Sequence, residues 1–292
     1  MKGILLSIIT IAVLCSCEHR EINTYTNTEM VFDWKNLMSG DTKSTAMELH
    51  YYNKETGEHI VVNGNQDGSK QFIPYGTYQL LVFSSNVKNV EYKGLNNYNT
   101  AEIHAKKSNT VTKASLDTVL LQPGSIYAAK KEAIILKPVS EASNFITLEP
   151  YIKVIKVNIN FSGDTSQINN YNVSLSGIAS GINLATGNSL SDTTNANYNV
   201  NSGQVQMPTH KSQDLTLSFL GIANTKNIMT IGVTLSDSTV LSASADVTDA
   251  LCSINIKPVI KIDTKIDISP IGLKATITDW KVSTGSGTVG GK

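Results

Sequence analysis

The sequence predicts an all-β protein, and the pattern of hydrophobic residues carries that prediction. Many short segments alternate hydrophobic and polar residues, as strands with one buried face do. Turns rich in Gly and Asn separate these segments, and no stretch has a helical period of useful length. Short helical turns are the most that residues 117–121 and 127–133 suggest. Strands at this spacing favour β-sandwiches.

The first half of the chain contains an amphipathic strand, a hairpin and a central strand. In residues 24–35, Phe32 and Trp34 share one face. Residues 47–51 and 60–62 flank a turn at 54–57, which predicts a hairpin. Residues 78–83 (YQLLVF) are apolar at both odd and even positions, as in a central strand that is buried on both faces.

The second half continues the alternation. In four segments every second residue is hydrophobic, which places the hydrophobic residues on one face of a strand: 155–161, 215–219, 229–235 and 260–268. In the last of these segments, Lys and Asp of alternating sign form the other face, so we expect a solvent-exposed or edge strand.

The length of the chain, 292 residues, exceeds what one hydrophobic core usually spans. We therefore expect two tandem domains, at residues 24–150 and 151–284, with the boundary near Pro150. The end of the chain, residues 285–292 (GSGTVGGK), has nothing to bury and is expected to be a flexible tail.

The N-terminus has the features of a bacterial lipoprotein signal. A short positive start precedes an apolar run at residues 4–14, which is too short to cross a bilayer and so predicts a signal peptide at residues 1–16. Leu14-Cys15-Ser16-Cys17 resembles a lipobox, with Cys17 as the acylated residue because Ser16 is small. Residues 17–23 would then form a lipidated tether. The alternative is an ordinary secretory signal with incidental cysteines.

Composition narrows the class of function. Lys plus Arg equals Asp plus Glu, at 24 each, and no block of like charge occurs. This argues against nucleic acid as a partner. With Cys17 lipidated, Cys252 has no cysteine partner, so no disulfide framework is expected. A charged fraction of only 16%, with abundant Ser, Thr and Asn, suits an extracytoplasmic β-protein with long loops.

Motifs for catalysis or metal binding are missing from the sequence, so we expect no enzyme activity, no metal and no cofactor. Only His50 and His59 could meet, across the first hairpin, and surface histidines are the simpler interpretation. Trp34 and Trp280 lie in the same tripeptide, Asp-Trp-Lys, and are expected to fill the core rather than bind sugar.

Several short motifs follow one another along nearly the whole mature chain. They lie at residues 31–34, 47–49, 56–57, 73–78, 174–181, 184–187, 235–237, 247–249 and 277–280. Single motifs are weak, but their order resembles that of the Bacteroidales fimbrillin-like lipoproteins.

The resemblance implies two transthyretin-like β-sandwiches and a role as an anchor, accessory or terminal subunit of a fimbria. It implies a lipid-anchored protein of the outer membrane, at the cell surface, that joins subunits of the same type by β-strand donation. In extending subunits of this family an arginine-specific protease removes the first strand. Here Arg20 is the only arginine, so that protease could cut the tether but could not expel residues 30–35.

Two other functions stay open. The first is a stand-alone surface lipoprotein that binds a glycan or host ligand, in which Trp34, Trp280 and the Tyr/Asn-rich loops would be exposed. The second is an enzyme that uses paired carboxylates, which would require clustered acids in a cleft.

Overall fold

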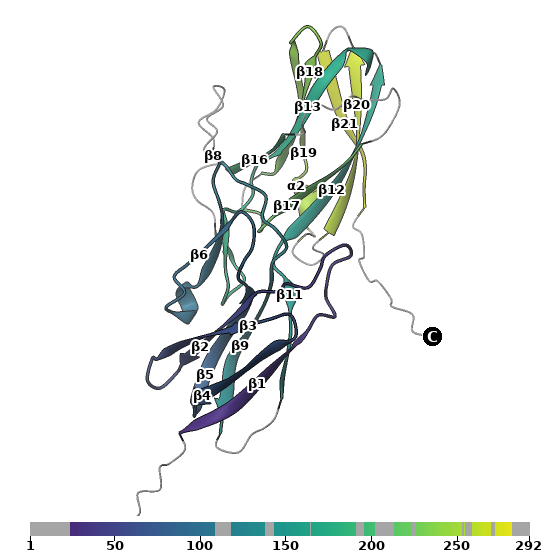
Figure 1. Cartoon of the computed structure of the whole chain (residues 1–292). Coiled ribbons are helices and arrows are strands. Elements are labelled where there is room, and N and C mark those ends of the chain that lie inside the picture. Colours follow the sequence, from purple (N-terminus) through teal and green to yellow (C-terminus); the bar gives the residue numbers. More distant parts are fainter. Residues whose placement is uncertain are drawn as a thin grey trace, which may run out of the picture.

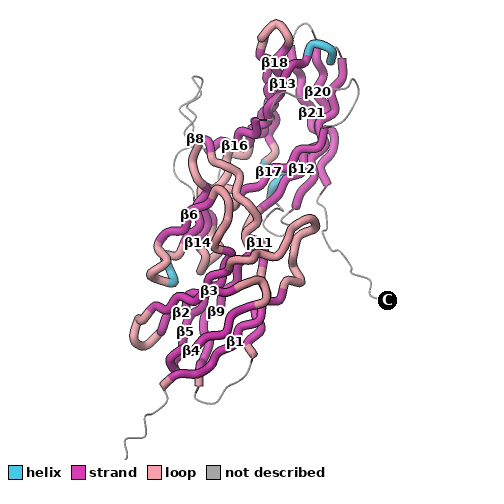
Figure 2. Tube along the Cα trace, in the orientation of Figure 1, coloured by secondary structure: helices cyan, strands magenta, loops and turns pink. Residues whose placement is uncertain are grey.

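The computed structural model describes residues 24–108, 118–137, 143–163, 165–190, 196–201, 213–223, 226–252, 254, 259–269 and 272–281. Strands dominate these residues, which confirms the all-β class (Figure 2). The helical elements are single turns: η1 (Tyr98–Thr100), η2 (Thr165–Gln167) and α2 (Thr248–Leu251). In the described ranges, no helix is long and apolar enough to cross a membrane.

Two sheets enclose the first hydrophobic core, at the end of the molecule where the described chain begins (Figure 1). The smaller sheet has the order β10 (Asn144–Thr147), β1 (Tyr25–Asp33), β4 (Gly68–Pro74). The larger has the order β11 (Glu149–Pro150), β9 (Tyr127–Leu136), β5 (Gly76–Ser84), β2 (Met47–Asn53), β3 (His59–Gly64). The predicted hairpin is confirmed, since β2 pairs with β3 in antiparallel register.

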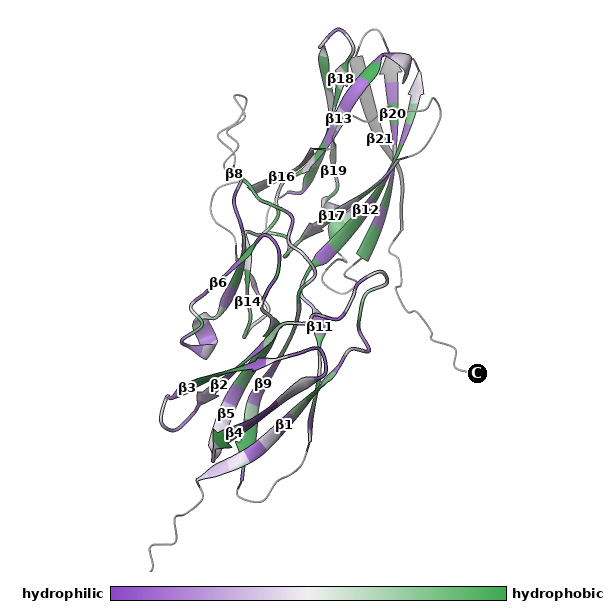
Figure 3. Ribbon diagram, viewed as in Figure 1, coloured by the Kyte–Doolittle hydropathy of each residue, from purple (hydrophilic) through white to green (hydrophobic). Residues whose placement is uncertain are grey.

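The larger sheet is buried on both faces at its centre. On β5, Tyr78, Leu80 and Val82 point into the first core, whereas Leu81 and Phe83 join a second cluster on the opposite face. The prediction of a doubly buried strand at residues 78–83 is therefore confirmed. Figure 3 shows hydrophobic segments along the neighbouring strand β9 and along β12.

The second face of the larger sheet contributes to a cluster that also includes residues of a four-stranded sheet drawn from both halves of the chain. Its order is β15 (Ser189–Leu190), β14 (Gly181–Asn183), β7 (Glu102–Ala105), β6 (Val90–Lys93). A short parallel pair, β8 (Thr118–Val119) with β16 (Ala196–Asn201), links the halves again. Two strand pairs thus join residues before 150 to residues after it. The division into domains 24–150 and 151–284 stays a prediction, and so does the transthyretin-like type of the domains.

The remaining two sheets face each other over the other end of the second core (Figure 1). One has the order β17 (Gln213–Phe219), β12 (Lys153–Gly163), β20 (Val259–Ser269), β21 (Gly272–Lys281). The other has the order β19 (Val240–Asp246), β18 (Ile228–Leu235), β13 (Ile168–Leu175), β16, β8. All four strands predicted for this half are present.

The two predicted helical turns and the predicted edge strand at residues 260–268 are not found. Residues 127–133 do not form a helical turn but lie in β9, whose alternate residues Tyr127 and Ala128 enter the two different cores. Residues 118–119 likewise form β8. Strand β20 is not an edge strand: it lies between β12, to which it is parallel, and β21. On its charged face Lys261 and Lys265 are exposed, as expected, and Asp263 and Asp267 are partly exposed. The isoleucines of the other face, Ile260, Ile262 and Ile266, are buried.

Candidate functional site

The first strand, β1, lies in the middle of its sheet and is held on both sides. It pairs antiparallel with β4 from Tyr25 to Val31, and parallel with β10 from Met30 to Asp33. Its alternate residues point inward and are buried: Thr26, Thr28, Met30 and Phe32. Because each strand's main-chain groups are paired across the sheet, removing β1 would open a groove between β4 and β10. This groove is the first candidate site.

Trp34 closes the end of the groove. Only 8% of this residue is exposed, and its Nε1 donates a hydrogen bond to the carbonyl of Gln66 at 2.7 Å. The ring packs edge-on against Tyr127, with the centroids 5.4 Å apart. The prediction that Trp34 fills the core is confirmed. Strand β21 contains Trp280, whose side chain lies outside what the structure describes.

The residues predicted to carry lipidation and cleavage, Cys17 and Arg20, lie outside the described residues, as do the signal peptide, the tether and the tail. Their roles stay predictions. Cys252 is a free, exposed cysteine.

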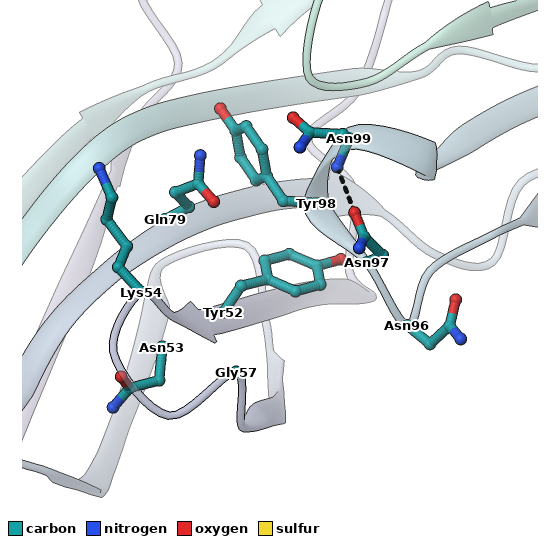
Figure 4. A pocket seen from close by; sticks show the side chains of 9 residues that line it. All are labelled: Tyr52, Asn53, Lys54, Gly57, Gln79, Asn96, Asn97, Tyr98 and Asn99. Carbon is teal, nitrogen blue, oxygen red and sulfur yellow. Dashed lines mark hydrogen bonds between the residues drawn. The ribbon is translucent and has the colours of Figure 1, made fainter.

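A surface pocket beside the first hairpin is the second candidate site. Its walls are the turn after β2 and the polar loop before η1, with Gln79 of β5 between them (Figure 4). The side chains of Asn96, Asn97 and Asn99 are exposed, whereas the rings of Tyr52 and Tyr98 are 6% and 4% exposed. The lining residues are Tyr52, Asn53, Lys54, Gly57, Gln79, Asn96, Asn97, Tyr98 and Asn99.

Hydrogen bonds of the two tyrosines fix the floor of this pocket. The Tyr52 hydroxyl donates to the carbonyl of Leu95 at 2.8 Å, and the Tyr98 hydroxyl donates to Glu132 Oε1 at 2.9 Å. Burial raises the pKa of both phenols above the ordinary value, so they stay protonated donors at neutral pH. The exposed amides, rather than the tyrosine rings, are therefore the groups available to a ligand.

The pocket turn recurs in the second half of the chain. Asn53 accepts hydrogen bonds from the backbone of Thr56, and the Gly57 N–H closes the turn on the Asn53 carbonyl at 3.0 Å. The segment 183–187 repeats this arrangement, with Thr186 and Gly187 in the same roles around Asn183. Both glycines have positive φ, at 73° and 78°, which glycine adopts without strain. Asn183 also donates from Nδ2 to the Asn99 carbonyl at 2.8 Å, which ties this second turn to the pocket loop.

His50 and His59 meet across the first hairpin, as their spacing suggested. Nδ1 of His50 lies 2.9 Å from Nε2 of His59, and Nε2 of His50 lies 3.1 Å from Glu48 Oε2. The interpretation as surface histidines was wrong for His50, which is 2% exposed. Burial, followed by the neighbouring His50, lowers the pKa of His59. The ring of Tyr52 stacks on His59 at 4.6 Å, so this pair lies directly behind the pocket.

The arrangement offers no metal site within the part of the chain that the structure describes. No three His, Cys, Asp or Glu side chains converge there, and Glu48 approaches the nitrogen of His50 that faces away from His59.

The comparisons with known proteins place the chain in a family. Residues 16–200, more than half of the chain, match the model of a domain of unknown function, DUF5119. The chain belongs to this family. No curated protein matches the sequence.

Solved structures share the DUF5119 chain's fold at low sequence identity. A "putative adhesin" from Bacteroides ovatus has 16% identity and a TM-score of 0.63, over 88% of this chain and 95% of its own. The fimbrial anchor protein Mfa2 from Porphyromonas gingivalis has 13% identity and a TM-score of 0.55, over 88% and 99%. A "putative polysaccharide binding" protein from Bacteroides thetaiotaomicron has 11% identity and a TM-score of 0.55, over 88% and 96%. The resemblance to Bacteroidales fimbrillin-like proteins is thus confirmed at the level of the fold.

Sequence reasoning noticed the Asn-rich loop but missed the pocket. The loop at residues 96–99 and the turn at residues 53–57 are distant in sequence. The packing of Tyr52 against Tyr98, with ring centroids 5.8 Å apart, and the hydrogen bond from Tyr52 to Leu95 bring them together. No local signal in the sequence marks these contacts.

Proposed function

We propose that this protein is a non-enzymatic lipoprotein of the outer membrane, tethered through an acylated Cys17, that serves as an anchor, accessory or terminal subunit of a fimbria. Its partners are fimbrial subunits of the same type, joined by β-strand donation. The fold shared with an adhesin-like structure and with a fimbrial anchor protein supports this proposal.

The position of β1 carries the proposal. The strand is paired on both sides, and its inward residues Met30 and Phe32 belong to the first core. The only arginine, Arg20, precedes the strand, so an arginine-specific cut would leave β1 in its sheet. A subunit whose own strand fills this groove cannot accept a donor there, and such a subunit ends a polymer rather than extends it.

Two measurements on intact cells test this function together. Palmitate feeding is expected to label the protein, and the Cys17→Ser variant is expected to lose the label. Cross-linking before a denaturing gel is expected to give a heat-labile ladder that contains other subunits. An unlabelled wild-type protein would refute the lipid tether, and a lone monomer after cross-linking would refute the fimbrial role.

The exposed amides of the pocket favour a second candidate, a surface module that binds a neutral glycan. Asn and Gln side chains are common hydrogen-bond partners for sugar hydroxyls because each offers both donors and an acceptor. A solved structure of the same fold is described as a polysaccharide-binding protein, which supports this candidate. The burial of Trp34, Tyr52 and Tyr98 counts against it, because no exposed aromatic face is left at the pocket for stacking.

A glycan array with the purified protein separates the two candidates. If the pocket binds sugar, Asn97→Ala is expected to lose the signal, whereas Asn63→Ala on the edge strand β3 is expected to keep it. Binding that both variants retain would exclude the pocket as the site.

A further inference from the structure

Three exposed hydrophobic side chains lie near the end of the first sandwich where β1 begins, on both of its outer faces. Tyr25, Phe72 and Ile135 are 52%, 71% and 61% exposed. We call these three residues the tether-end patch. They account for half of the large hydrophobic residues that are exposed in the described part of the chain, the others being Val61, Phe145 and Val240.

Strand register places the members of the patch at one end although they are distant in sequence. Tyr25 pairs with Pro74, and Asn27 pairs with Phe72, so the first and second members lie on adjacent strands. The chain reverses at Tyr75, whose N–H donates to the Thr24 carbonyl at 2.8 Å. Ile135 lies opposite Thr77, at the start of β5, and points outward from the larger sheet because its neighbours Ile134 and Leu136 belong to the first core. In Figure 1 the beginning of β1 and the end of β4 lie together at this tip of the molecule.

The surroundings of the patch are those of a membrane interface. Lys137, directly after β9, is exposed at this end, and Lys70 is exposed further along β4, level with Glu29. The tip of the first hairpin, which follows Asn53 opposite Tyr78, adds Lys54, Glu55 and Glu58, so the rim carries charges of both signs. Aromatic rings with flanking lysines are enriched where proteins meet lipid headgroups, because the rings are amphipathic and the lysine ammonium can reach water.

The length of the tether limits how far the first sandwich can lie from the bilayer. From Cys17 to the first described residue, Thr24, the fully extended chain reaches about 25 Å. If Cys17 is acylated, as proposed above, the lipid therefore keeps this end of the sandwich within that distance of the bilayer. The patch is the exposed hydrophobic surface of the described chain that the tether holds nearest to the bilayer.

We propose that the tether-end patch docks on the lipid surface of the membrane that holds the acylated Cys17, so that the first sandwich stands on the bilayer by the end where β1 begins. This inference rests on the lipid anchor of the proposed function. It adds a second contact to the acyl chains and fixes the orientation of the protein, with the second core directed away from the membrane.

Tryptophan reporters in reconstituted protein test the proposal. The acylated, full-length mature protein would be placed in vesicles of phosphatidylethanolamine and phosphatidylglycerol that contain phosphatidylcholine with brominated acyl chains. Phe72→Trp and Ile135→Trp report on the patch. Phe145→Trp lies further along the sheet, level with Val31, and Val240→Trp on β19 is the matched control at similar exposure.

The brominated lipid is expected to lower the added emission of the two patch reporters by about twofold, as for rings at the interface. It should affect Phe145→Trp less and leave Val240→Trp unchanged. If the protein floats with the vesicles but the patch reporters are not quenched, or are quenched no more than Val240→Trp, the docking proposal is wrong and the lipid anchor stands. If the protein does not float, both the anchor and the docking proposal are wrong.

Discussion

The indole ring of Trp34 meets the phenol ring of Tyr127 edge-on, at a centroid distance of 5.4 Å and an interplanar angle of 61°. Tyr127 in turn donates its hydroxyl to Asp41 Oδ2 at 2.8 Å and accepts the Met38 N–H. The contact joins the residue that follows β1 to the larger sheet across the first core. It therefore holds the C-terminal end of β1 against the larger sheet.

Trp34→Ala is expected to destabilise the protein by about 3–5 kcal/mol, because it leaves a large cavity and an unpaired Gln66 carbonyl. Urea unfolding followed by circular dichroism measures the loss. Phe72→Ala, which removes an exposed ring, is the control and should change stability by about 0.5 kcal/mol or less. Equal losses in the two variants would contradict the structural role of Trp34.

Gly68 allows β4 to approach β1. A Cβ atom there would lie 1.9 Å from the carbonyl oxygen of Met30, and φ is +143°, where other residues are strained. Gly40 also has a positive φ, +93°, but its Cβ would meet nothing within 4 Å. Gly68→Ala is therefore expected to cost at least about 2 kcal/mol more than Gly40→Ala, in the same unfolding assay. A similar cost for both would show that the strand can move aside.

The two related turns give a matched pair of substitutions. Asn183→Asp keeps the side-chain oxygen that accepts the Thr186 N–H, but it loses the Nδ2 group that donates to the Asn99 carbonyl. Asn53→Asp changes the related turn, whose Asn53 side chain makes no such bond to the pocket loop. Asn183→Asp is expected to destabilise the protein by about 1 kcal/mol. Hydrogen exchange should report faster opening in this variant at Asn99 and Leu184, whose N–H groups donate to Asn97 Oδ1 and to the Ala101 carbonyl. Protection at those amides that equals the wild type would refute the link.

The pKa of His59 predicts a loss of stability in acid. Burial and His50 lower this pKa in the folded protein, so the unfolded chain binds more protons near pH 6. The contribution of His59 is complete above about pH 6.5, the ordinary histidine value, and declines as the pH falls below it. His59→Gln keeps a hydrogen-bond donor for His50 without titrating there. Its unfolding midpoint should fall less between pH 7.5 and 5.5 than that of the wild type, and an equal fall would contradict the assignment.

The alternation of hydrophobic residues was enough to predict strands that bury one face, such as β1, β12, β17 and β18. It correctly marked residues 78–83 as doubly buried, since both parities of β5 are apolar. It failed at β9, where exposed Lys130, Glu132 and Ala133 interrupt the pattern and resemble a polar helical turn. It also failed at β20. A charged face shows that one face of a strand meets solvent, but it does not reveal that other strands, here β12 and β21, pair with both edges.

The candidate site was only partly visible in the sequence for a related reason. The burial of Trp34 and the meeting of His50 with His59 follow from local strand geometry, and both were predicted. The antiparallel sheet that joins β7 to β14, and the pocket beside it, depend on contacts between segments that are far apart in sequence. The hydrophobic alternation within a single strand does not predict such long-range contacts.

The most direct test of the central claim is the N-terminus of the mature protein from cells. Mass spectrometry of the purified protein should find acylated Cys17; a start at Glu21, directly after the only arginine, would keep the first strand but would refute the lipid tether. In both cases Tyr25–Asp33 is still present in the chain. A mature protein that begins at Asn36 or later would have lost β1, and would contradict the proposal that this subunit keeps its own strand.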